Sequence, residues 1–250
     1  MTRRAISFTA VAAAAVLLAG GCSDDLICPE VEPADTTPYI RAFVAQRSGS
    51  GDESTHAEVA CTADPLPSLL IAFVNGRTLP DVGPSDGLGL LAVLDDDTML
   101  WQPGTLCSLE VTTDYGYATA AAVMPAAAAV TAPAGISLGD SLRLVWGSVT
   151  GADYYEVSAI LVPDASATMW GFPGNRDTLA LSATTRETFA VFLPGSLTST
   201  GVVSGFVETV AGPFPEGGAV GNVSGDGWGF FTLRYLDPGS AFDVVVSAVP

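Results

Sequence analysis

The sequence predicts an all-β protein with two β-sandwich domains. Its 27 Gly and 17 Pro residues separate many short apolar runs, a pattern typical of strands joined by turns rather than of helices. About seven such runs lie between residues 39 and 126, which is the strand density of a sandwich domain. The small residues of 126–133 mark a linker, so we expect one domain over 39–126 and a second over 127–250.

The N-terminus predicts export and attachment to a membrane. Arg3 and Arg4 precede the apolar run Ala5–Gly21, and Cys22 follows, which is the layout of a secretory signal peptide. The ending LLAGGC resembles the lipobox of bacterial lipoproteins. The resemblance implies that residues 1–21 are cleaved, that Cys22 carries the lipid, and that Ser23 favours the outer membrane in a Gram-negative organism. An uncleaved anchor is the alternative, although the apolar run is at the short limit for spanning a bilayer.

The charge balance restricts the partners of the chain. There are 27 acidic and 9 basic residues, for a net charge of −18 at pH 7. Such a surface repels phosphate backbones and anionic headgroups, so we expect no nucleic-acid partner and ascribe membrane attachment to the lipid alone. Residues 22–38 alternate acids with prolines and predict a disordered tether.

The first domain carries a family resemblance. Ala57–Cys61 and Leu70–Gly76 resemble strands B and C of an immunoglobulin-like domain, and Pro103–Cys107 resembles the start of its strand F. The resemblance implies that Phe73 takes the place of the core tryptophan and that Cys61 and Cys107 form a disulfide. Cys28, in the tether, is a competing partner. The Asn75-Gly76 pair independently predicts a tight hairpin turn.

The second domain resembles a fibronectin type III domain. Gly139–Trp146 and Val149–Val157 look like strands B and C of that family, and Leu236–Val246 looks like strand F. On this alignment no room remains for a strand G. The distance between strands C and F implies a long insertion over about residues 163–229.

The sequence contains no recognisable catalytic, cofactor or metal site. His56 is the single histidine, which argues against a serine or cysteine protease and against zinc. Asp95, Asp96 and Asp97 lack the spacing of a calcium loop, so a solvated turn is the favoured interpretation. No carboxylate pair can be singled out among 27 acids, so a hydrolase that uses an unrecognised pair stays open.

The aromatic residues of the insertion are the candidate binding residues. Trp170 with Phe172, and Trp228 with Phe230, have the spacing that places each pair on one face of a strand. Such side chains either stack on sugars and dock partners or fill a core. We therefore predict a non-enzymatic, lipid-anchored envelope protein without cofactors, which presents binding or spacer domains to a glycan or an envelope protein. A carbohydrate-binding or adhesion module is the alternative.

Overall fold

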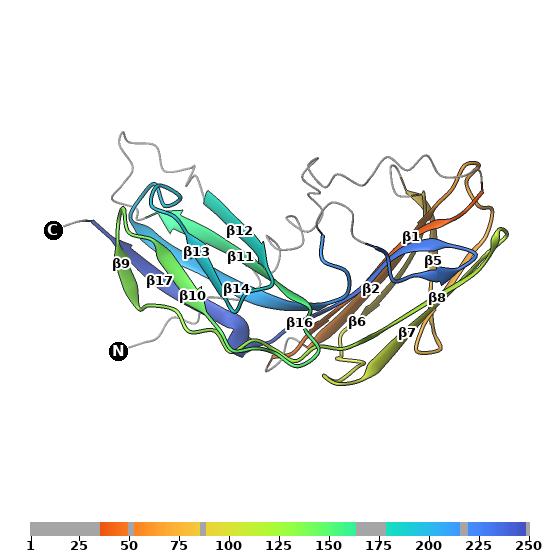
Figure 1. Cartoon of the computed structure of the whole chain (residues 1–250), viewed down its shortest axis with the longest axis horizontal. Helices are drawn as coiled ribbons and strands as arrows, with labels where there is room; N and C mark the ends of the chain where they lie inside the picture. Colours follow the sequence, from red (N-terminus) through yellow and green to blue (C-terminus); the bar gives the residue numbers. More distant parts are fainter. Residues whose placement is uncertain (1–35, 50–52, 86–88, 164–178, 216–219, 249–250) are drawn as a thin grey trace.

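The computed structural model describes residues 36–49, 53–85, 89–163, 179–215 and 220–248 (Figure 1). The predicted signal peptide, most of the tether, and the candidate residues Trp170 and Phe172 lie outside the described residues. Within them every regular element is a strand except the short 3₁₀ turn η2 (Pro238–Ser240). The predicted all-β sandwich class is therefore confirmed.

The first sandwich has the strand order of an immunoglobulin domain. One layer runs β1-β2-β6-β5 and the other β4-β3-β7-β8, with antiparallel pairing throughout. This is the A-B-E-D and C′-C-F-G arrangement, so the predicted strands B, C and F are confirmed as β2, β3 and β7. The strands are β1 (Tyr39–Arg47), β2 (Ser54–Thr62), β3 (Leu70–Val74), β4 (Arg77–Leu79), β5 (Asp81–Ser85), β6 (Gly89–Asp96), β7 (Leu106–Thr113) and β8 (Gly116–Val123).

Local sequence explains these elements. In β1, inward Ile40, Ala42 and Val44 are buried and alternate with half-buried outward residues, as a strand with one covered face requires. The β3–β4 turn is made by Asn75 and Gly76, both at positive φ (49° and 74°), as predicted for a tight hairpin.

The expected role of Phe73 is wrong. It is half-buried on the outward side of β3, where Ala72 and Val74 point inward. A tryptophan does lie in this core, but it is Trp101, which is 8% exposed and comes from the segment between β6 and β7.

The second sandwich follows the same plan. β10 pairs with β13, and the opposite layer runs β12-β11-β14-β17 with β9 beside β17. Trp146 and Tyr155 pack together in its core, 5.3 Å between ring centroids, where the fibronectin resemblance places them. The strands are β9 (Gly135–Ser137), β10 (Leu142–Val145), β11 (Tyr154–Pro163), β12 (Leu179–Thr185), β13 (Phe189–Phe192), β14 (Gly201–Ala211) and β17 (Ala241–Ser247).

This topology corrects two expectations about the second domain. The strand in the F position is β14, and β17, within the stretch predicted as F, is the last strand in the G position. The described part of the predicted insertion is mostly framework, because β12, β13 and β14 lie within it. The segment that departs from the pattern is shorter and runs from Gly212 to Asp237, between the F and G strands.

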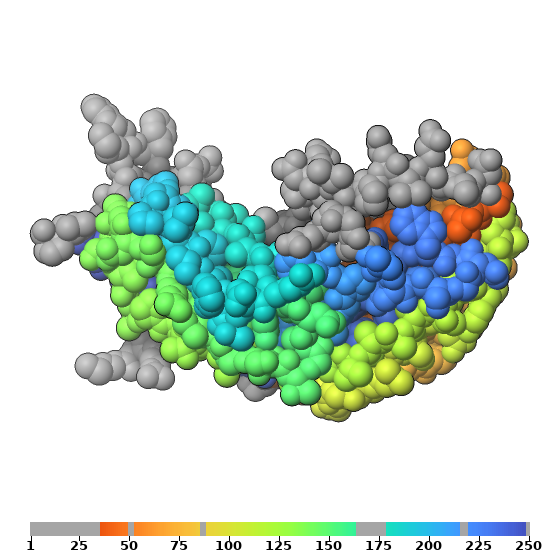
Figure 2. All heavy atoms as spheres, viewed as in Figure 1, coloured from red at the N-terminus to blue at the C-terminus, as the bar shows by residue number. Residues whose placement is uncertain are grey.

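That departing segment joins the two sandwiches. β15 (Ser224–Gly225) extends the β8 side of the first sandwich, and β16 (Trp228–Leu236) pairs with β1 in parallel over nine residues. The C-terminal part of β16 also pairs with β14, so one ten-stranded sheet runs through both sandwiches. Figure 2 shows this segment (blue) lying between red-orange and yellow-green residues of the first sandwich.

The cores therefore do not follow the predicted division at residue 126. Phe231 and Leu233 of β16 are fully buried in the same cluster as Ile40 and Val59 of the first sandwich. The first domain thus consists of two chain segments, the second of which is contributed by the C-terminal half.

Candidate functional site

The candidate site is an aromatic cluster on the outward face of the ten-stranded sheet, made by Tyr39, Trp228 and Phe230. Strand alternation turns Trp228 and Phe230 outward while Gly229 and Phe231 point into the sandwich. The parallel register places Trp228 opposite Tyr39. The Tyr39 ring lies 4.6 Å from that of Trp228 and 6.3 Å from that of Phe230, at interplanar angles of 50° and 79°.

Glycine at position 229 allows this arrangement. Its φ is +141°, and a Cβ there would collide with the backbone carbonyl oxygen of Ile40 on β1. The backbone N–H of Trp228 donates to the carbonyl of Pro38 at 3.0 Å, which fixes the beginning of β16 against the residue before β1. The position of Trp228 thus depends on close backbone contact between the beginning of β16 and the beginning of β1.

Beyond the aromatic cluster the same face carries charged groups. Arg41 lies 3.8 Å from Glu58, and Nδ1 of His56 lies 2.6 Å from a carboxylate oxygen of Asp95. Phe43 packs beside the His56 ring, with 5.3 Å between centroids. The face therefore has an apolar, aromatic end and a polar end that carries both basic and acidic side chains.

Arg234 closes the polar end and links the sandwiches. Its guanidinium donates to both carboxylate oxygens of Glu156 at 2.7 and 3.2 Å, and to Glu208 at 3.1 Å. It also lies over the Phe43 ring, 6.0 Å from the centroid. Burial raises the pKa of Glu208, although the charge of Arg234 acts in the opposite direction.

Glu156 and Glu208 are the facing carboxylates that a hydrolase would require. They are cross-strand partners on β11 and β14. Both bind the same guanidinium, however, so their oxygens are engaged in an ion-pair network rather than directed at an open cleft. This pair gives no support to the hydrolase alternative.

The structure separates the predicted candidate residues. It places Trp228 on the outer face, half-buried, and not in the core. Phe214, a further aromatic residue of the predicted insertion, packs against Tyr154 in the second sandwich, and the Arg186 guanidinium lies over its ring. Sequence reasoning missed Tyr39, because only the pairing of β1 with β16 brings that residue to Trp228.

The predicted disulfide between Cys61 and Cys107 is not formed: both thiols are free and buried. Cys61 lies close enough to Asp114, just beyond the C-terminal end of β7, for that carboxylate to help raise its pKa. Cys107 lies near the other end of β7, six residues before its last residue Thr113, and six residues of a strand span about 20 Å. A disulfide needs Cα atoms within about 7 Å of each other, so the two cysteines are too far apart. Burial, the main cause, raises the pKa of each thiol to about 11.

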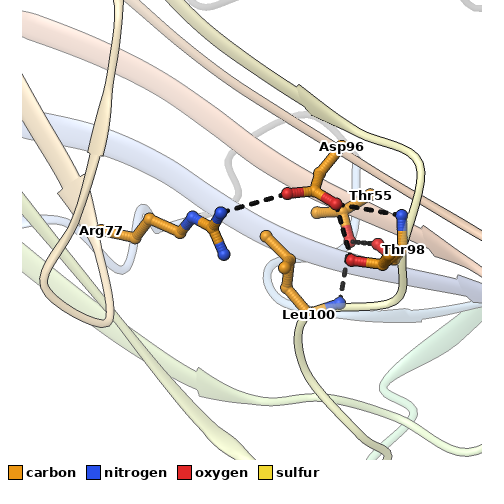
Figure 3. Close-up of polar contacts among 5 residues, drawn as sticks. All are labelled: Thr55, Arg77, Asp96, Thr98 and Leu100. Carbon is orange, nitrogen blue, oxygen red and sulfur yellow. Dashed lines mark hydrogen bonds and ion pairs between the residues drawn. The ribbon is translucent and has the colours of Figure 1, made fainter.

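Asp96, the last residue of β6, holds the turn that follows the strand in place (Figure 3). Asp96 accepts hydrogen bonds from the Thr98 hydroxyl at 2.6 Å and from Arg77 at 3.1 Å, and the first of these is the main cause of its lowered pKa. Thr55 donates to the Thr98 carbonyl and accepts from the Leu100 N–H. Among the described residues no cluster of three or more His, Cys, Asp or Glu side chains could hold a metal ion.

Comparisons with known proteins add little. No family model and no curated protein matches the chain. Among solved structures, the mouse nectin-like molecule 4 ectodomain (Ig1–Ig3) is 15% identical, with a TM-score of 0.25. The alignment covers 85% of this chain and 64% of that ectodomain. Tandem Ig repeats of Dlar are 13% identical (80% and 99% covered, TM-score 0.25), and a chimeric titin Z1Z2 is 17% identical (86% and 100% covered, TM-score 0.22). TM-scores this low do not establish a shared fold, so the immunoglobulin-like assignment depends on the strand order of the sandwiches.

One further finding concerns membranes. In the part of the chain that the structure describes, no helix has the length and apolar character to cross a bilayer.

Proposed function

We propose that the protein is a non-enzymatic binding and spacer module, held on the outside of a bacterial membrane by a lipid on Cys22. One observation carries the proposal: the nine-residue parallel pairing of β16 with β1. This pairing both fuses the two sandwiches and creates the aromatic cluster. The lipobox resemblance supplies the anchor, and the net charge of −18 makes a nucleic-acid partner unfavourable.

The spacer role follows from the continuous sheet. Domains joined only by a linker move relative to each other. Here β16 is bonded to β1 on one side and to β14 on the other, and Arg234 ties the same strand to Glu156 and Glu208. Bending between the sandwiches would break these bonds, so the module holds the two sandwiches in one fixed arrangement relative to each other.

The ring geometry favours a protein partner over a glycan. Sugar chains stack on flat aromatic surfaces, whereas the rings of Tyr39, Trp228 and Phe230 are inclined at 50° and 79°. Aromatic residues such as Trp, Tyr and Phe are enriched at the centre of protein interfaces, and polar and charged residues are typical of the rim around that centre. The partner on this proposal is therefore an envelope protein, and the carbohydrate-binding alternative becomes an outcome of the test.

The test uses the full chain in its membrane. A photo-reactive amino acid at position 230 should cross-link to one envelope protein, and Trp228→Ala should abolish the cross-link while the circular dichroism spectrum is retained. The same probe at Leu106, 62% exposed on the opposite layer, is the matched control. Equal labelling from both positions would refute the binding face. Binding to a glycan array that Trp228→Ala removes would establish the carbohydrate alternative instead.

The anchor has a separate test. Cys22→Ala should release the protein from membranes and abolish incorporation of labelled palmitate, because the acylated thiol is then missing. A variant that stays membrane-bound and labelled would refute the lipid assignment without affecting the binding face.

A further inference from the structure

β12 is an unusual edge strand in this molecule. It lies at one end of the ten-stranded sheet and, among the described residues, pairs only with β11. The pairing is regular over seven residues, from Leu179 opposite Leu161 to Thr185 opposite Tyr155. Its outer edge therefore presents a row of backbone N–H and C=O groups to which another strand can add.

The other edges are covered or blunted, as natural sheets require. β16 covers the edge of β1. β5 contains Pro84 and a register shift between Asp81 and Gly83. The remaining edge strands β4, β9, β10, β13 and β15 have four residues or fewer. β15 pairs with β8 only at Ala118 and Thr119, so residues 120–123 of β8 are also uncovered, but this stretch is short. β12 has the longest uncovered edge in the described part of the chain.

The sequence of β12 lacks the usual protection of an edge. LALSATT contains no charged residue, no proline and no glycine, in a chain whose net charge is −18. Ala180, Ser182 and Thr184 are exposed, while Leu181 is buried toward the second core. A strand laid alongside would meet small side chains that cause neither steric nor electrostatic conflict.

We infer that two copies of this chain associate through antiparallel pairing of β12 with β12. A two-fold axis at Ser182 pairs all seven residues: Leu179 with Thr185, Ala180 with Thr184, Leu181 with Ala183, and Ser182 with its counterpart. In this register the exposed Ala180, Ser182 and Thr184 of both copies lie on one face of the joined sheet, and the Leu181 side chains of both copies lie on the other face. No like charges are brought together. The pairing joins the two ten-stranded sheets into one, independently of the proposed binding face.

The net charge of the chain determines how dimerisation should depend on salt. Each copy carries −18, so the copies repel one another at long range, and salt screens that repulsion. Because the strands themselves are uncharged, dimerisation should become stronger as ionic strength rises. Association through opposite charges would show the reverse dependence.

Register-specific cross-linking tests this arrangement. Full chains with Cys28→Ser plus Ser182→Cys or Thr184→Cys are oxidised in mild detergent. Directly opposed residues have Cα atoms about 4.5–5.5 Å apart, which a disulfide spans, whereas the two copies of residue 184 lie about 13 Å apart along the strand. Cys61 and Cys107 are buried, and Cys22 is common to both variants. Any difference in the yield of disulfide-linked dimer therefore comes from the position of the introduced cysteine.

We expect at least tenfold more disulfide-linked dimer for Ser182→Cys than for Thr184→Cys, increasing with salt. Co-expressed Ala180→Cys and Thr184→Cys chains should form the mixed dimer. Ser182→Lys, which places two like charges at the axis, should lower the dimer fraction in sedimentation experiments. Equal cross-linking at 182 and 184, an absence of dimer, or exclusive cross-linking to a different protein would each overturn the inference.

Discussion

Replacing Phe231 with Ala should destabilise the N-terminal sandwich, although residue 231 lies in the C-terminal half of the chain. Phe231 is fully buried in the first core and stands opposite Ala42 of β1. Truncating a buried Phe to Ala costs about 3–5 kcal/mol through lost burial and the residual cavity. That is a large share of the roughly 5–15 kcal/mol by which domains are stable.

Urea denaturation combined with hydrogen exchange measures this effect. Phe231→Ala should lower the free energy of unfolding by the stated amount, and the amides of β1, β2 and β16 should lose protection together. The control is Phe230→Ala, one residue away but on the outward face, which should cost far less. Normal protection of β1 and β2 in Phe231→Ala would refute the assignment of β16 to the first core.

Three further outcomes follow from the ion-pair network and the thiols. Arg234→Met should destabilise the protein by about 3–5 kcal/mol in urea titrations, because it leaves Glu156 and Glu208 half-buried without a cation. Burial raises the pKa of Glu208 above 4.5, so the stability gained by protonation is present below that pH and lost as the pH rises through the folded-state pKa. Glu208→Gln should accordingly be more stable than the parent at pH 7 but not at pH 4, and a stability gap independent of pH would contradict this. With pKa values of about 11, Cys61 and Cys107 should resist a maleimide at pH 8 until urea unfolds the chain, and rapid labelling of the folded protein would show that they are not buried.

Local patterns in the sequence were sufficient for most strands of the first sandwich and for strands B and C of the second. Asn75-Gly76 predicts its hairpin because two successive residues at positive φ suit that pair. The alternation in β2, and the Trp146 and Tyr155 pair, place strands B and C correctly because side-chain period and core packing act within a few residues.

The cysteine prediction failed for a reason of register. Cys61 and Cys107 do lie on the B and F strands that the resemblance assigned. Strand identity does not specify the level along a strand, however, and the two thiols lie toward opposite ends of the sandwich. Their separation is determined by how β3 and β7 align, with Leu70 opposite Thr113.

The sequence by itself determined the all-β class, most strands of the first sandwich, and which side chains of β16 share a face. Only the tertiary structure decided that β16 joins β1, and hence that Trp228 lies beside Tyr39 on an outer surface. The alternation of Trp228, Gly229, Phe230 and Phe231 fixes two faces of a strand but does not say which core the inner face fills. Strand addition uses backbone hydrogen bonds that almost any residue can make, so a partner nearly 190 residues away leaves no local signal in the sequence.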